Sequence, residues 1–510
     1  MGEKKCLGIR RTVLGVGLAL LVLGGQGAFA EEKILKVAQG ADITNLDPQK
    51  ISDIPTANVV RQIYNGLVKV DKENNIQPDL AESWENVDEK TWVFHLKKGV
   101  LFHNGDELKA SDVKFTFDRI MNPETKSTGM THVKEIQSVE VVDPFTVKLI
   151  LKRPFSPLIT NLSRYEVVIL NERAVTEAGV DYAKKPVGTG PFKFVEWIPG
   201  DKVTLAKFDQ YFEGAPKIDG VVYRAIPEDA TRVIELESGG VDLVAPPFPP
   251  QDFAAMKERK DMTTHETLAQ STIFVGFNTT AKPFDNKLVR QAVNYAIDKQ
   301  AIIDTIYSGL ASPSHGPLSP RVSGYDSSLP PAYPYDPEKA RALLKEAGFP
   351  DGFKTWIWAN PTTERKMICE MVQQYLAEVG ISVEIELIEW GAFLAATGRG
   401  AKGMYTLGWI GTGDADGGLY PRFHSSNIGG INRNYWSSPK VDELLDKART
   451  SMNAEERKAI YNEVQHIVVE EAPELFLAVQ IETAVSKPYV KGYELYPNRI
   501  VPLKNVFFEN

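Results

Sequence analysis

The stretch 354–390, "KTWIWANPTTERKMICEMVQQYLAEVGISVEIELIEW", predicts a strand, a helix and a second strand in immediate succession. Short apolar runs suited to strands lie at 354–359 and, with clear alternation, at 381–388. Between them, over 364–379, apolar residues recur three or four positions apart, and Gly380 follows as a helix terminator. Strands joined by a helix of this length run parallel, so the stretch indicates an α/β fold.

A third strand is expected at 404–409, after a short helix. In open parallel sheets the carboxyl ends of the strands share one edge, and ligands bind there. The three strand ends lead into 360–365, 389–390 and 409–416, so we expect these segments to converge at one rim. The side chains brought together would be Arg365, Trp390, Trp409, Asp414 and Asp416. The alternative for both indoles is packing beneath neighbouring loops.

The segment 408–421, "GWIGTGDADGGLYP", carries two aspartates in a run of glycines. A calcium loop starting at Thr412 would place Thr at its first position and Phe423 at its twelfth, where oxygen ligands are needed. A phosphate-binding loop needs a final Gly-Lys-Ser/Thr, which is absent. A glycosidase needs carboxylates on opposite sides of a sugar, which two aspartates on one loop do not provide. The lip of a binding site remains, with hydrogen bonds to the loop's own amides as the alternative role for the aspartates.

The chain shows no pattern typical of an enzyme. It has neither a G-x-S-x-G nor an H-E-x-x-H motif. Its histidines are scattered singly, at positions 95, 103, 132, 265, 315, 424 and 466. We therefore predict no catalytic set, no cofactor and no metal site.

The first thirty residues have the pattern of a signal peptide. A basic start is followed by the apolar run 13–23 and by Ala28-Phe29-Ala30, which predicts cleavage after Ala30. The apolar run is shorter than the roughly 20 residues that span a bilayer, and no later run is long enough. The formal net charge of −9 argues against nucleic acid or anionic lipid as partners. We expect a periplasmic monomer that does not span the membrane.

The stretch 79–120, "DLAESWENVDEKTWVFHLKKGVLFHNGDELKASDVKFTFDRI", predicts a hairpin followed by a helix capped by Ser111. As a pattern it resembles the signature block of the family 5 extracellular solute-binding proteins, the peptide, nickel and glutathione receptors of bacterial ABC importers. The resemblance continues in order through "NLDPQK" (45–50), "VGTGPFKFVEW" (187–197), "FVGFNTTAKPFDNKLVRQAVNYAIDKQAII" (274–303), "DPEKARALLKEAGF" (336–349) and "VDELLDKAR" (441–449).

This resemblance implies a two-lobed α/β fold, the type II or Venus-flytrap periplasmic binding protein, with an extra subdomain in the first lobe and two hinge crossings. The extended apolar runs 271–279 and 474–485 are candidate crossings. The domain boundaries expected on this basis are a signal peptide at 1–30, a lobe I core at 31–60, 187–271 and 487–510, an inserted subdomain at 61–186, and lobe II at 272–486.

The resemblance also bears on the ligand. In peptide-binding members an aspartate three residues after the Gly-Trp pair holds the ligand's ammonium group, and this chain has Thr412 there. The segment 412–436, "TGDADGGLYPRFHSSNIGGINRNYW", instead looks like the branch labelled glutathione-binding. That match implies Thr412, Asp414 and Asp416 in the binding loop. It also implies Arg365 and Arg433 as candidate partners of a ligand carboxylate.

The expected function is capture of a short peptide or peptide-like solute, such as glutathione or a di- or oligopeptide. The solute would be delivered to the permease subunits of an ABC transporter and their ATPases. Trp409 would form a flat wall, Arg365 a carboxylate anchor and Asp414 an ammonium anchor. The alternative within the family is a nickel chelate or an oligosaccharide, and the remote alternative is a secreted hydrolase.

Overall fold

The computed structural model describes residues 32–509, and it confirms the α/β unit predicted from 354–390. β15 (Phe353–Ala359) pairs in parallel with β16 (Ile381–Leu387) along its whole length, and β17 (Met404–Trp409) pairs in parallel on its other side. α11 (Thr363–Glu378) connects β15 to β16 and starts one residue before the predicted position. Gly380 follows at φ +88°, a left-handed conformation that glycine adopts without strain.

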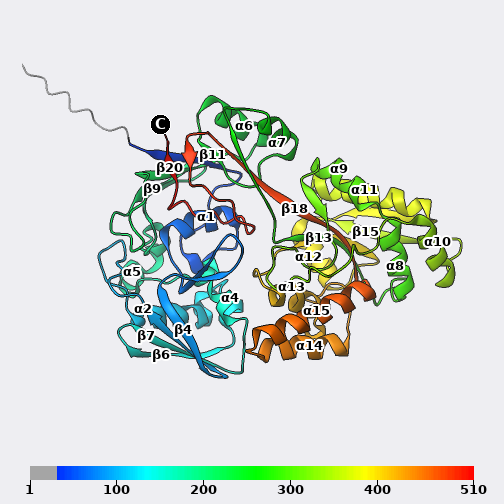
Figure 1. The fold of residues 1–510 in the computed structure, drawn as a ribbon, viewed down its shortest axis with the longest axis horizontal. Helices are drawn as coiled ribbons and strands as arrows, with labels where there is room; N and C mark the ends of the chain where they lie inside the picture. The colour runs from blue at the N-terminus through cyan, green and yellow to red at the C-terminus, as the bar shows by residue number, and fades with distance from the viewer. Residues whose placement is uncertain (1–31, 510) are drawn as a thin grey trace, which may run out of the picture. The chain divides into compact units, whose positions relative to one another are not determined.

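These strands belong to a large sheet ordered β16-β15-β17-β13-β18-β11-β1-β10-β9-β8. Its two halves are joined by β18 (Glu474–Ser486). The first half of β18 pairs with β13 (Thr272–Phe277), and the second half pairs with β12 (Thr263–Leu268) and β11 (Leu243–Val244). Figure 1 shows β18 as the long red strand that runs from the β13–β15 region to β11. The predicted two-lobed arrangement with two extended crossings is therefore present.

The partner exchange within β18 locates the second crossing more closely than the sequence does. Ala478 pairs with Ile273, whereas Ile481 already pairs with Leu268. The strands paired with β18 on this side therefore change between residues 478 and 481, inside β18. The remaining domain boundaries stay predictions. The predicted signal peptide, 1–30, lies outside the described residues.

The half of the sheet around β11 forms the core of lobe I. Its further strands are β1 (Ile34–Gln39), β8 (Phe192–Ile198), β9 (Lys202–Lys207) and β10 (Gly220–Ala225), and its helices are α1 (Ile54–Ile63), α6 (Asp229–Ser238) and α7 (Pro250–Lys257). The C-terminal segment, with β19 (Val490–Lys491) and β20 (Phe507–Phe508), returns to this core. Leu503 packs in the same buried cluster as Val60 and Tyr64.

An antiparallel sheet ordered β4-β5-β7-β6 forms the inserted part, with its own buried cluster. Its elements, with the small hairpin that precedes it, are β2 (Val68–Val70), β3 (Ile76–Pro78), β4 (Ala81–Asp88), β5 (Thr91–Leu96), β6 (Ile136–Asp143), β7 (Thr146–Leu151), α2 (Ala110–Met121), α3 (Met130–Val133), α4 (Leu158–Leu162) and α5 (Glu172–Ala178). The prediction that Ser111 caps α2 is wrong. Ser111 lies inside the first turn, and Asp112 Oδ2 accepts the hydrogen bond from the Lys109 amide that precedes the helix.

Helices cover the other half of the sheet. They are α8 (Lys287–Ala296), α9 (Lys299–Tyr307), α10 (Pro337–Glu346), α12 (Trp390–Gly398), α13 (Ala415–Phe423), α14 (Pro439–Thr450) and α15 (Ala454–Glu471), and β14 (Ala311–Pro313) adds to β18. Within residues 32–509, no helix has both the length and the apolar character needed to cross a bilayer.

Candidate functional site

The glycine-rich segment 408–421 consists of a strand end (408–409), a short loop (410–414) and the start of a helix (415–421). β17 ends at Trp409, and α13 begins at Ala415, although the segment reads as a loop in the sequence. Asp414 caps α13, because its Oδ1 accepts hydrogen bonds from the Gly417 amide at 3.0 Å and from Thr412 Oγ1 at 2.8 Å. The Trp409 indole donates to the Gly417 carbonyl at 2.9 Å. These bonds fold the segment back on itself and fix the direction in which Trp409 and Thr412 point.

The two aspartates have different surroundings. Both oxygens of Asp416 accept hydrogen bonds from the Arg449 guanidinium, at 2.8 and 3.0 Å. Burial raises the pKa of Asp416, while Arg449 acts in the opposite direction. Asp414 is also buried, and its Oδ2 has no hydrogen-bond partner among the described residues. The geometry favours a structural role for Asp416 at the start of α13, and Asp414 is engaged at one oxygen only.

Two cavities flank the segment. The smaller one, about 170 Å³, is lined by Trp409 with Trp390 and Arg433. The larger one, about 430 Å³, is lined by Ile410 and Thr412 together with many residues of 52–79, 163–213 and 492–505. The short strip Trp409–Thr412 therefore contributes residues to two different cavities. Gln270, which lies between β12 and β13, supports the strip by donating from Nε2 to the Gly411 carbonyl at 3.0 Å.

The structure brings some of the predicted site residues together and separates others. Trp390 is 48 % exposed and stacks on Phe393, so it is not packed beneath a loop. Arg433 lines the smaller cavity, but its Nη1 donates to the Leu394 carbonyl and to Thr397 Oγ1, at 2.5 and 2.9 Å. Arg365 lies beside β17, where its Nη1 makes one long hydrogen bond of 3.4 Å to Thr406 Oγ1. Its Nη2 is 3.2 Å from the position that a Cβ on Gly408 would occupy.

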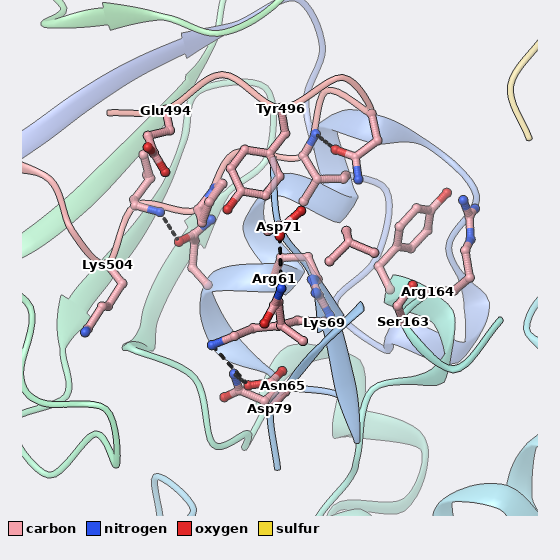
Figure 2. A pocket seen from close by; sticks show the side chains of 18 of the residues that line it. Arg61, Asn65, Lys69, Asp71, Asp79, Ser163, Arg164, Glu494, Tyr496 and Lys504 are labelled. Carbon is pink, nitrogen blue, oxygen red and sulfur yellow. Dashed lines mark hydrogen bonds and ion pairs between the residues drawn. The ribbon is translucent and has the colours of Figure 1, made fainter. Parts of the chain in front are cut away.

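Two groups of lining residues were missed in the sequence. One is the buried pair Arg422–Glu474 in the wall of the smaller cavity. The other is the set of charged residues in the larger cavity, among them Arg61, Asp71 and Lys504 (Figure 2). The available signal for Arg61 was local, because it is the only charged residue in the sequence of α1, "IPTANVVRQI". The other members come from segments far apart in the chain and share no local pattern.

Gly417→Ala is expected to disrupt the strip. A Cβ at Gly417 would lie 2.0 Å from Thr412 Oγ1 and 2.6 Å from the Thr412 amide, so the 411–413 segment must move. Overpacking of this kind costs about 1–3 kcal/mol of unfolding free energy, measurable by urea denaturation. Gly391→Ala is the matched control, because its Cβ would meet only the Glu389 carboxylate, at an ordinary van der Waals distance of 3.4 Å. Equal stability of the two variants would contradict the expectation.

Comparisons with known proteins agree in family and fold. The model described as "Bacterial extracellular solute-binding proteins, family 5 Middle" matches residues 75–430. The glutathione-binding protein GsiB of Pectobacterium atrosepticum is 34% identical over 507 residues, covering 96% of this chain and 97% of the relative.

Solved structures of other binding proteins have the same fold. HbpA2 from Haemophilus parasuis superimposes with a TM-score of 0.86 at 29% identity, over 94% of this chain and 100% of the other. The periplasmic binding protein DppA from Helicobacter pylori, solved with the peptide STSA, gives 0.79 at 32% identity, over 94% of this chain and 98% of the other. The predicted type II binding-protein fold is confirmed by these similarities.

Proposed function

We propose, since the chain belongs to the family 5 bacterial extracellular solute-binding proteins, that it captures a short peptide or peptide-like solute between its two lobes. The relatives include a glutathione-binding protein and a protein solved with a peptide, which favours peptides over nickel chelates and oligosaccharides. In this proposal the solute is bound and released unchanged, and an ABC permease receives it. The chain would act in the periplasm after removal of a signal peptide ending at Ala30.

The observation that carries the proposal is the position of the strip Trp409–Thr412 between two cavities. Trp409 offers a flat apolar face whose orientation is fixed by its bond to Gly417. Of the two predicted arginines, Arg365 is the less engaged candidate for a carboxylate anchor, because Arg433 already donates to the end of α12, but Arg365 lies beside β17 and lines neither cavity. We assign Asp416, in the first turn of α13, to its ion pair with Arg449 of α14, which occupies both of its oxygens, and Asp414 to the cap of α13.

The mechanism requires only differential binding. A solute that contacts both lobes stabilises the closed state by the difference between its affinities for the closed and open states. The two crossings, at β12–β13 and within β18, are the segments about which such a movement would occur. No bond in the solute is made or broken.

Isothermal titration calorimetry with glutathione, Ala-Ala-Ala, Met-Leu, maltotriose and a nickel–histidine complex tests the proposal. We expect at least one of the three peptides to bind with a Kd of about 1 μM or lower. Mass spectrometry after incubation should recover that peptide intact. Binding of the sugar or the nickel complex without binding of any peptide would overturn the proposal, and so would hydrolysis of the bound peptide.

Trp409→Ala is expected to weaken binding of that peptide about tenfold or more, since an aromatic wall contributes buried area with little loss of side-chain entropy. Trp409→Phe should stay within about threefold of the wild type, because the ring remains and only the bond to Gly417 is lost. Trp356→Ala is the matched control, because Trp356 bonds Glu384 and lines neither cavity. Equal affinities of the Trp409→Ala and Trp356→Ala variants would remove Trp409 from the site.

A further inference from the structure

The larger cavity contains a guanidinium group that the protein does not satisfy. Arg61 projects from α1 into this cavity, and its Nη1 is buried without a hydrogen-bond partner among the described residues. No carboxylate in the described part of the chain lies within ion-pair distance of it, and Asp79 is the carboxylate that acts on it most strongly. Figure 2 shows Arg61 near Asn65, Lys69 and Asp79. A buried guanidinium left in this state is costly unless a ligand supplies the acceptor.

The carboxylates of the same cavity, in contrast, have their hydrogen-bond partners within the protein. Asp71 accepts from the amides of Glu73 and Asn75, from the Asn75 side chain and from Gln77 Nε2, at 2.8–3.2 Å. These bonds hold the pKa of Asp71 below its usual value.

The three other carboxylates that line the larger cavity also have hydrogen-bond or ion-pair partners within the protein. The oxygens of Asp79 accept from the Asn65 side chain and the Gly66 amide, at 2.9 and 3.1 Å. Glu213 pairs with Lys69, and Glu494 pairs with Lys72. The cavity therefore has an unused donor at Arg61 but no unused acceptor at these four carboxylates.

A second arginine of the same cavity is already paired with a carboxylate of the protein. Arg164 also lines the cavity, and its Nε and Nη2 donate to both oxygens of Glu166, at 3.2 and 3.0 Å. Arg61 has no such internal carboxylate. Because a guanidinium binds a carboxylate with two parallel hydrogen bonds, Arg61 is suited to a carboxylate that arrives with the solute.

We propose that the larger cavity is a carboxylate subsite anchored by Arg61, and that the solute is a peptide-like compound with two carboxylates. This inference rests on the proposed function. Arg61 lies in the cavity that Ile410 and Thr412 face, whereas Arg365 lies outside both cavities, beside Gly408 just before the strip. A solute that reaches from the larger cavity past the strip to Arg365 would place one carboxylate at each arginine. A neutral dipeptide has a single carboxylate and leaves one of the two guanidinium groups without an acceptor.

The test compares glutathione, which carries two carboxylates, with two analogues that each lack one of them. These are the glycine monoethyl ester of glutathione and γ-aminobutyryl-Cys-Gly, which lacks the carboxylate of the γ-glutamyl residue. Calorimetry on wild type and Arg61→Gln should show glutathione weakened at least tenfold by the substitution. For one of the two analogues the substitution should change Kd by less than threefold, because the group that Arg61 binds is already missing.

A conservative variant and a matched control show whether the effect depends on the unpaired guanidinium of Arg61. Arg61→Lys keeps the charge but not the bidentate geometry, and it should bind glutathione with intermediate affinity. Arg164→Gln is the matched control, because it lines the same cavity but removes a guanidinium already paired with Glu166. It should change glutathione binding less than Arg61→Gln does.

Three results would overturn the inference while leaving the proposed function intact. They are a glutathione Kd within twofold of wild type in Arg61→Gln, equal weakening of glutathione and both analogues, and tight wild-type binding confined to peptides with one carboxylate. If the wild-type protein binds no peptide at all, the proposed function fails, and this inference fails with it.

Discussion

Replacing Glu474 by alanine is expected to lower the free energy of unfolding by about 3–5 kcal/mol, because it leaves the Arg422 guanidinium buried without a counter-charge. Arg422 and Glu474 are 3 % and 0 % exposed and form a direct ion pair. Glu474 also accepts from Asn434 Nδ2 at 2.8 Å, and Arg422 donates to the Pro317 carbonyl at 2.8 Å. Urea denaturation followed by circular dichroism measures the loss.

Two further variants distinguish an unpaired charge from a simple loss of packing. The double substitution Arg422→Met with Glu474→Leu removes both charges and should recover a large part of the loss. Glu463→Ala breaks an exposed pair with Lys440, whose side chains are 49 % and 57 % exposed, and should cost less than about 1 kcal/mol. If Glu474→Ala costs no more than Glu463→Ala, the buried pair does not have the stabilising role assigned to it.

The pair also ties the smaller cavity to the crossing strand. Glu474 is the first residue of β18, and Arg422 lies near the end of α13, whose start is set by the Asp414 cap. Arg422 also stacks on Phe274 of β13, with its guanidinium carbon 4.5 Å from the ring centre. The strip that carries Trp409 is thus fixed at one end by the cap of α13 and beneath by this ion pair. A site built on fixed elements holds its ligand contacts in a defined geometry.

The predictable part of the fold was the part with periodic burial. β15, α11 and β16 followed from apolar spacing, and the two crossings followed from long extended runs. α13 was missed, because glycines and Pro421 within it have low helix propensity. Leu419 and Phe423 are fully buried, and this packing together with the Asp414 cap outweighs that propensity.

The candidate site was predictable only where strand ends dictate it. Trp390 and Trp409 meet in one cavity, as the shared edge of parallel strands requires, whereas Arg433, which only the family resemblance implied, joins them from a later loop. Asp416 was expected at the rim, but Arg449, which lies on another helix, occupies both of its oxygens. No local pattern connects such partners. The lobe I residues of the larger cavity were missed for the same reason, since Arg61 and Lys504 line it together only because the C-terminal segment returns to lobe I.

Lowering the pH from 7 to 4.5 is expected to destabilise the fold through three enclosed histidines. Burial lowers the pKa of His103, His132 and His265 to about 4 in each case. His103 shows the cause most clearly. Its Nε2 lies 2.9 Å from the Gly190 carbonyl, to which it donates, and its Nδ1 accepts from the Gly188 amide. Protonation would place a second proton on Nδ1 and break the bond from Gly188.

Because these folded-state pKa values lie below the unfolded value of about 6.5, the unfolded chain binds more protons between pH 6.5 and 4. The corresponding stability is fully present above pH 6.5 and is lost as the pH falls toward 4. Each histidine should contribute a loss of about 2 kcal/mol by pH 4.5. Urea denaturation at pH 7 and pH 4.5 measures the sum.

His103→Gln should reduce the pH-dependent part of the stability loss by about 2 kcal/mol, even though it lowers stability at pH 7. His95→Gln is the control, because the His95 side chain is 41 % exposed, and it should show the same pH-dependent loss as the wild type. A wild-type stability that stays constant from pH 7 to 4.5, or a His103→Gln variant with an unreduced loss, would show that these rings are not held neutral by burial.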